Sequence, residues 1–186
     1  MTPDPTPSAA SGPRDSVAAE LDSWIGQMSG ADPTTEAARQ RIGRVSRQFE
    51  RLLAEVAAGH QLTVGDWTAL SALQRSGPPY QRTPKQLAEE LGVTAGTMSV
   101  RIDRLTQAGL VEPVPAADGR SRPVRLTDLG RQRWSRATRD RTTREHDLLA
   151  DALNPHELDQ LNHLLARLLT RLEIEYGPAP RHGQQR

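Results

Sequence analysis

The sequence predicts a mainly α-helical fold with one small β-ribbon. Helix-capping residues recur along the chain, and the segments between them carry apolar side chains at helical spacing. Only residues 110–126 change this pattern, because valines and prolines there flank an Asp-Gly pair typical of a hairpin turn. Hydrophobic residues make up 35% and aromatic residues 3% of the 186-residue chain. This composition supplies little core for a monomer, so we expect either a disordered part or a partner that completes the core.

The N-terminal part contains a tail and two expected helices. Residues 1–13 are rich in Pro, Ser and Ala and lack the basic and apolar regions of a signal peptide, so we expect a disordered tail. Within residues 14–60 the first helix is an amphipathic segment over residues 16–28. The second, longer helix begins at Asp32-Pro33, where the aspartate caps the helix and the proline occupies its first position. We expect residues 14–60 to serve in dimerisation, with a possible ligand pocket.

The central segment, residues 61–127, contains three shorter expected helices and the ribbon. Thr63 begins the first of these helices, and a Gly-Pro-Pro sequence ends it. Thr83 and Gln86 have the spacing of a capping box, in which each side chain bonds to the other residue's backbone N–H. Thr94 caps the third helix. The prolines beside the Asp-Gly turn favour edge strands, so we expect a two-stranded ribbon with an Arg-rich tip.

The C-terminal part, residues 128–176, is expected to form two long helices. Thr127 caps the first, and Asn154 caps the second, where a proline and a glutamate follow. The leucines of the last helix step by three and four residues, as in the seam of a coiled coil. They are Leu158, Leu161, Leu165, Leu168 and Leu172. We expect this helix to contribute to dimerisation and residues 177–186 to form a frayed tail.

Charge is unevenly distributed along the chain. Residues 97–144 hold 11 Arg against five acidic residues, a net charge of +6, whereas the whole chain carries +1. One face is therefore expected to meet a polyanion. The chain has no cysteine, which excludes disulfides, Cys-ligated zinc and thiol chemistry. No apolar run approaches the ~18 residues of a membrane span, so we expect a cytoplasmic protein with no membrane partner.

The spacing of small and apolar residues in the central segment indicates a helix-turn-helix. Ala88 is expected to pack against the next helix, Gly92 lies in the turn, and Met98 holds the second helix on the first. The outer positions of the second helix are polar: Thr94, Thr97, Ser99, Arg101 and Arg104. Together with the basic ribbon, this pattern predicts a winged helix-turn-helix domain that binds double-stranded DNA.

The same residues carry a family resemblance. The stretches LTVGDWTALSAL, TPKQLAEELGVTAGTMSVRIDRLTQAGLV and DGRSRPVRLTDLG resemble the MarR family of bacterial transcriptional regulators, including its DxR wing motif at Asp118 and Arg120. The resemblance implies a homodimer whose N- and C-terminal helices interlock. It also implies that the helix over 94–108 enters the major groove and that Arg120 enters the minor groove, with Asp118 orienting the Arg120 side chain.

General chemistry supports DNA-contact roles for these residues. Thr97 and Ser99 can bond to base edges, and the Thr94 hydroxyl at a helix N-terminus can hold a phosphate. Arg101 can bond to guanine through two N–H groups. Arg120 and Arg122, on a narrow ribbon, suit the negative potential of a narrow minor groove. Arg104 has two open interpretations: it contacts DNA, or it pairs with Asp103 or with a neighbouring helix. Of the arginines in the helix after the ribbon, only Arg131 and Arg133 are expected to reach a phosphate.

A possible small-molecule effector is less well defined by the sequence. The extra N-terminal helix resembles the subgroup that binds urate or related anions. Trp24 and Arg101 match two of that subgroup's four ligand positions, but Thr68 and Pro113 replace the other two polar residues, so we do not predict urate. The candidate ligand-binding residues are Trp24, Asp66, Trp67 and Arg101. The effector, the target genes and the sign of regulation are not specified by the sequence.

No sequence motif indicates an enzyme. The chain lacks HExxH, P-loop, GxSxG and GxGxxG patterns, and His156 and His163 lack a carboxylate placed to complete a zinc site. We therefore expect no catalytic residue, metal or cofactor. The prediction is a homodimeric, ligand-responsive repressor that binds an inverted-repeat operator. Two alternatives stay open: a constitutive or architectural DNA-binding protein without an effector, and a helical protein-interaction module, against which the Arg-rich wing argues.

Overall fold

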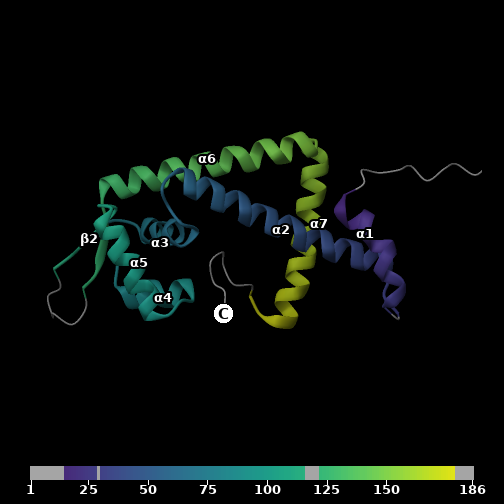
Figure 1. The fold of residues 1–186 in the computed structure, drawn as a ribbon, viewed down its shortest axis with the longest axis horizontal. Helices are drawn as coiled ribbons and strands as arrows, with labels where there is room; N and C mark the ends of the chain where they lie inside the picture. The colour runs from purple at the N-terminus through teal and green to yellow at the C-terminus, as the bar shows by residue number, and fades with distance from the viewer. Residues whose placement is uncertain (1–14, 29, 116–121, 179–186) are drawn as a thin grey trace, which may run out of the picture. The chain divides into compact units, whose positions relative to one another are not determined.

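A computed structural model describes residues 15–28, 30–115 and 122–178, and the expected mainly α-helical architecture with a small sheet is confirmed (Figure 1). The elements are α1 (Ser16–Trp24), a 3-10 helix η1 (Ile25–Gln27), α2 (Pro33–Gly59), α3 (Val64–Arg75), β1 (Gln81–Arg82), α4 (Pro84–Leu91), α5 (Ala95–Gln107), β2 (Val111–Pro113), β3 (Val124–Leu126), α6 (Asp128–Ala152) and α7 (Pro155–Tyr176). The first helix differs from its expected length, since its α-helical part ends at Trp24 and a tighter turn follows. Gly26, a poor helix former, lies in that turn.

The chain divides into two compact units, residues 1–50 and 51–186. In the first unit, α1 is joined to the first half of α2 by polar contacts. Arg41 Nε donates to Asp15 Oδ2 over 2.7 Å, and Arg44 Nη2 donates to Glu20 Oε2 over 2.5 Å. Asp15 also caps α1, since its Oδ1 accepts from the Ala18 backbone N–H at 2.7 Å. The hydrogen bond from Arg41 is the largest cause that lowers the pKa of Asp15 to about 2.

The second unit contains the main core, which surrounds α3. Leu70 and Leu73 of α3 are fully buried. Leu53 and Ala57, in the last turns of α2, belong to the same core, although the sequence analysis grouped them with the N-terminal helices. The cluster extends to the strands and to Ala137 of α6. The core of the central segment is therefore completed by side chains from both of the long helices that flank it in sequence.

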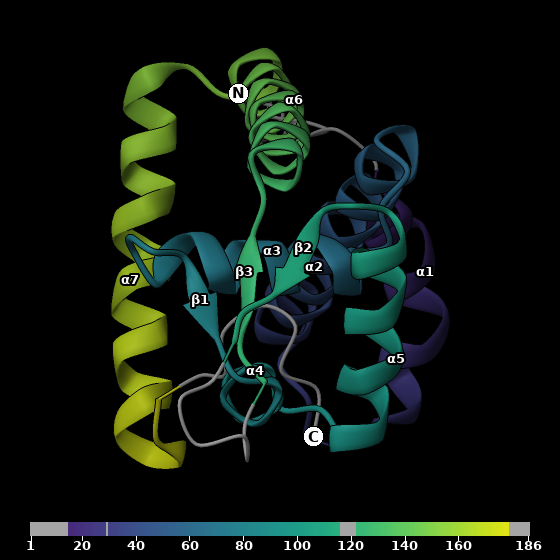
Figure 2. The ribbon, with the colours of Figure 1, turned by 90° about the vertical axis from the view of Figure 1, so that its left-hand side faces the viewer.

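The sheet has three strands, in the order β1-β3-β2, and all its pairs are antiparallel (Figure 2). The expected ribbon corresponds to β2 and β3, but the expectation of only two strands was wrong. The two-residue strand β1 pairs Gln81 with Arg125 and Arg82 with Val124. Its pairing is extended by the Leu126 N–H, which donates to the Tyr80 carbonyl at 3.1 Å. A strand this short has no alternating pattern for a sequence reading to detect.

The helix-turn-helix has the predicted capping. Thr83 and Gln86 form the capping box of α4, and Thr94 accepts from the Thr97 N–H at the start of α5. Gly92 ends α4 with φ 63°, a left-handed conformation that glycine adopts without steric cost. Met98 is fully buried. The other buried side chains of the two helices are Leu87, Ala88, Leu91, Ile102 and Leu105. This packing leaves the opposite face of α5 exposed.

The C-terminal helices differ in burial. Near its middle, α6 bonds to α3, since Trp67 Nε1 donates to Thr138 Oγ1 at 3.1 Å and Trp134 Nε1 donates to Ser71 Oγ at 2.8 Å. By contrast, α7 buries none of its residues, and all five seam leucines are exposed. In the described part of the chain, no helix is long and apolar enough to cross a membrane.

Candidate nucleic-acid interface

The outer face of α5 presents hydroxyl groups from its first two turns. Thr94, Thr97 and Ser99 are all exposed. The Thr94 and Thr97 hydroxyl oxygens lie 2.9 Å apart, and the Thr97 N–H donates to Thr94 Oγ1 at 3.1 Å. The buried face of the same helix, which contains Met98 and Ile102, fixes this orientation. The predicted base-contacting and phosphate-contacting hydroxyls are thus brought together at the start of one helix.

Arg104 forms an ion pair with the neighbouring helix α3. Its Nη2 lies 2.5 Å from Asp66 Oδ1 and 3.2 Å from Thr63 Oγ1. The Asp66 side chain is only 5% exposed, whereas the Arg104 side chain is 49% exposed. Of the interpretations that the sequence left open for Arg104, the structure therefore shows the ion pair with a neighbouring helix. Contact between Arg104 and DNA stays a prediction.

Asp66 has a second structural role at the start of α3. Its Oδ2 accepts from the Thr63 backbone N–H at 2.9 Å, and its own N–H donates to Thr63 Oγ1, which completes a capping box. One carboxylate oxygen thus caps α3 while the other binds Arg104 of α5. From the sequence, Asp66 is predicted only as a candidate ligand residue, and its connection to Arg104 is not. The presence of Asp66 three residues after Thr63 has the spacing of a capping box and could have predicted its capping role.

Arg101 lies against α3 rather than projecting freely from α5. A Cβ at Gly65 would lie 2.5 Å from Arg101 Nη2, so the guanidinium occupies the space above that glycine. Burial is the largest cause of the lowered pKa of Arg101, to which the nearby charge of Arg104 adds, whereas the Asp66 carboxylate opposes the shift. From its position in the sequence, Arg101 is expected on the exposed face of α5. To bond to guanine, the side chain has to leave its position over Gly65.

The described part of the wing contains a cross-strand ion pair. Glu112 of β2 and Arg125 of β3 are directly opposite, and Arg125 Nη2 lies 2.6 Å from Glu112 Oε1. Arg122 is exposed at the start of the returning segment. Asp118 and Arg120, the predicted minor-groove pair, lie outside the described residues. The charge of Arg125, one of the 11 arginines of residues 97–144, is thus compensated by Glu112.

The candidate ligand residues are only partly brought together. Asp66 and Arg101 are neighbours, as described above. Trp67 instead packs toward α6, where Arg141 Cζ lies 4.8 Å from the centre of its ring. The backbone of Trp24 ends α1, but its side chain lies outside the described residues. No group of three or more His, Cys, Asp or Glu suited to a metal occurs in residues 15–28, 30–115 and 122–178.

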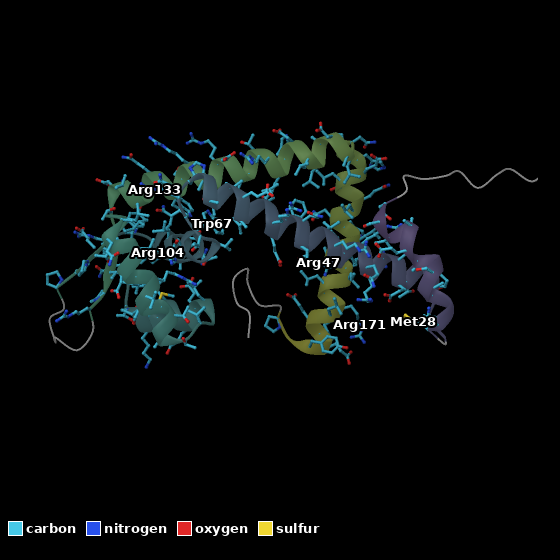
Figure 3. The ribbon with its side chains drawn as sticks, in the orientation of Figure 1. Met28, Arg47, Trp67, Arg104, Arg133 and Arg171 are labelled. Carbon is cyan, nitrogen blue, oxygen red and sulfur yellow. The ribbon has the colours of Figure 1, made fainter. Side chains whose placement is uncertain are left out.

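Basic side chains continue from the wing onto α6. Figure 3 places Arg104 on α5 and Arg133 on the first part of α6. Arg131 pairs with Asp128 at 3.1 Å, and its Cζ lies 5.5 Å from the centre of the Tyr80 ring. Arg133 is half-buried. The predicted phosphate-contacting residues Arg131 and Arg133 therefore lie beside the base of the wing.

These features define a class of protein: a winged helix-turn-helix of the DNA-binding type, with a polar outer face on the second helix of the motif. Residues 60–121 match a family model described as MarR family. The HTH-type transcriptional regulator PecS of Dickeya dadantii (strain 3937) is 33% identical over 133 residues, which are 71% of this chain and 77% of PecS. The chain belongs to the MarR family. It is a DNA-binding transcriptional regulator.

Solved structures agree with this assignment. Wild-type apo MarR from E. coli superposes with a TM-score of 0.62 at 27% identity, covering 70% of this chain and 94% of that chain. A mutant of E. coli MarR complexed with operator DNA gives a TM-score of 0.55 at 26% identity, covering 70% of this chain and 91% of that chain. The similarity therefore includes nearly the whole length of those proteins.

Proposed function

We propose that this protein is a ligand-responsive repressor whose homodimer binds an inverted-repeat operator. The observation that carries the proposal is the two-sided character of α5: Met98 and Ile102 are buried, while Thr97 and Ser99 are exposed. A helix held in this way by its apolar face can enter the major groove with its polar face toward the bases. Because the target is chromosomal DNA, the protein acts in the cytoplasm.

Each contact of the interface has a proposed role. Thr97 and Ser99 contact base edges, and Thr94 contacts a phosphate at the start of α5. Arg122 and the wing-tip residue Arg120 enter the minor groove, with Asp118 orienting Arg120. The position of Arg101 over Gly65 makes its base contact conditional on a side-chain movement.

The second copy of the chain is the proposed partner for α7. An exposed leucine seam over about four turns is costly in water, and a two-fold dimer removes it from solvent. Two α5 helices related by this symmetry contact two half-sites about one turn, or ~10 bp, apart. An inverted repeat is the DNA sequence with matching symmetry.

The proposed response to an effector acts through the Asp66 ion pair. An anionic effector that bonds to Arg101 or Arg104 competes with Asp66 for the same cations. The start of α3 and the side of α5 then lose a direct connection, and α5 can shift relative to the core. A constitutive DNA-binding protein without an effector is the alternative, and it requires only that this ion pair remain intact.

Footprinting on the DNA that flanks the protein's own gene tests the proposal. The expected result is protection of an inverted repeat, abolished by Thr97→Ala combined with Ser99→Ala. As a control, Lys85→Ala on α4 changes an exposed residue that has no role in the proposed contacts. Protection of a single half-site, or equal binding to scrambled DNA, contradicts the proposed function. Reporter expression from the footprinted promoter then distinguishes repression from activation.

A further inference from the structure

A polar pocket of about 240 Å³ lies between the end of α2 and the first turns of α6, and its lining includes Arg133, one of the two arginines of α6 expected to reach a phosphate. Its lining residues are Gly59, His60, Gln61, Leu129, Gln132, Arg133 and Arg136. All of them belong to the second compact unit. A pocket of this volume has room for a phosphate group with a small substituent.

Two arginines of α6, Arg133 and Arg136, line this pocket. Arg133 and Arg136 are three residues apart and therefore adjacent on the helix surface, where like charges repel. Within the residues that the structure describes, neither forms a side-chain hydrogen bond or ion pair, and the same holds for Arg139, which lies outside the pocket. Other arginines of α6 have acidic partners within four residues: Arg131 with Asp128, Arg141 with Glu145 and Arg144 with Asp140. Two adjacent cations thus face one pocket without a compensating carboxylate.

The remaining walls favour an oxyanion. No acidic residue lines the pocket, while Gln61 and Gln132 bring side-chain amide groups that can donate. His60 is oriented by Asp140, whose Oδ2 lies 3.3 Å from His60 Nε2. The same Asp140 accepts from Arg144 Nε at 3.0 Å, so its charge is shared with a cation outside the pocket. The potential within the pocket is therefore dominated by the two arginines.

We propose that this pocket binds a phosphate-type oxyanion through Arg133 and Arg136, with the amides of Gln61 and Gln132 as additional donors. Guanidinium groups bond to phosphate oxygens in pairs, and two adjacent guanidinium groups can enclose one such anion. The chemistry allows two sources. One is free phosphate or a small phosphate ester, and the other is a backbone phosphate of bound DNA, since α6 begins beside the wing.

The first experiment titrates inorganic phosphate into the DNA-free dimer by calorimetry, at constant ionic strength set with sodium chloride. Each arginine replaced by Gln removes charge-assisted bonds, so Arg133→Gln and Arg136→Gln are each expected to weaken phosphate binding about tenfold to a hundredfold. Arg139→Gln is the matched control, because Arg139 is an exposed arginine on the same helix that does not line the pocket. Circular dichroism of each variant checks that the helices are retained.

The second experiment measures operator binding at several salt concentrations with the same variants. If DNA supplies the phosphate, the double variant Arg133→Gln/Arg136→Gln lowers the slope of log K against log salt by about one, whereas Arg139→Gln leaves it unchanged. Specific loss in the calorimetric experiment together with an unchanged salt slope identifies a free anion instead. The proposal is overturned if wild type and both pocket variants bind phosphate equally or not at all and the operator slope is also unchanged. Because the calorimetric experiment contains no DNA, it can succeed even if the proposed operator binding is wrong.

Discussion

The Arg104 guanidinium of α5 lies 2.5 Å from the carboxylate of Asp66, which is almost completely buried at the start of α3. The same carboxylate caps α3 through the Thr63 N–H. One side chain therefore determines both where α3 begins and how α5 lies against it. This relationship connects the core of the second unit to the proposed DNA-reading helix.

Asp66→Ala is expected to lower the free energy of unfolding by about 1–2 kcal/mol, most of it from the lost cap, because the half-exposed Arg104 is screened by solvent. Urea denaturation measures this change. Arg104→Ala, which keeps the cap, is expected to cost less than about 1 kcal/mol. Operator affinity should fall in both variants, because α5 loses its bond to α3. An Asp66→Ala variant with wild-type stability and wild-type operator affinity contradicts this prediction.

Two glycine substitutions are expected to differ sharply in their effect on stability. In Gly130→Ala the new Cβ would lie 2.0 Å from the Leu110 carbonyl oxygen, and because backbone cannot move aside easily, we expect a loss of about 1–3 kcal/mol or more. In Gly65→Ala the Cβ meets only the end of the flexible Arg101 side chain. That variant should retain near wild-type stability, since alanine also favours the helix. Thermal unfolding of both variants checks the contrast, which fails if Gly65→Ala is the less stable.

The seam of α7 should determine the assembly. Burial of a leucine contributes about 1.5–3 kcal/mol, and each seam leucine occurs twice in a two-fold dimer. Leu161→Ala combined with Leu168→Ala is therefore expected to shift the dimer toward monomer at micromolar concentration in analytical ultracentrifugation. Leu164→Ala, on a more exposed position outside the seam, serves as the control. An unchanged sedimentation coefficient for the double variant would argue against the seam.

The wing tip is expected to contribute charge rather than base preference. Arg120→Ala should weaken binding to operator and scrambled DNA alike and reduce the salt slope by about one, because one cationic contact displaces about one counterion. Asp118→Ala should have a smaller effect, since Arg120 keeps its charge. Arg125→Ala is the control, because Arg125 is already paired with Glu112. Wild-type operator affinity of Arg120→Ala at every salt concentration would exclude the wing from the interface.

The contact between α1 and α2 should weaken at acidic pH. The pKa of Asp15 is lowered from 3.8 to about 2, mainly by its hydrogen bond from Arg41. A lowered pKa stabilises the folded state above pH 4, and this contribution is lost as the pH falls from about 4 to 2. Carboxylate chemical shifts measured by NMR should give a higher Asp15 pKa in Arg41→Gln than in wild type. An equal pKa in both proteins would show that Arg41 is not its partner in solution.

Much of the architecture could be predicted from the sequence because its determinants are local. Helix caps at Thr63, Thr94, Thr127 and Asn154 bond within three residues of the chain, so short windows of sequence contain the complete interaction. Likewise, the turn glycine and the buried Met98 follow from spacing alone. These local patterns predicted the winged helix-turn-helix, and with it the class of DNA-binding regulator.

The tertiary structure decided which polar side chains face outward. Arg101 and Arg104 have the spacing of exposed α5 residues, yet they lie over Gly65 and on Asp66, about 40 positions earlier in the chain. Strand β1 likewise forms only because β3 offers it a free edge. Such contacts depend on packing between distant segments, which no local pattern encodes. The sequence by itself therefore determined the helices, their caps and the protein class, whereas the fold decided the partners of the charged residues, because those partners are brought together only by the core.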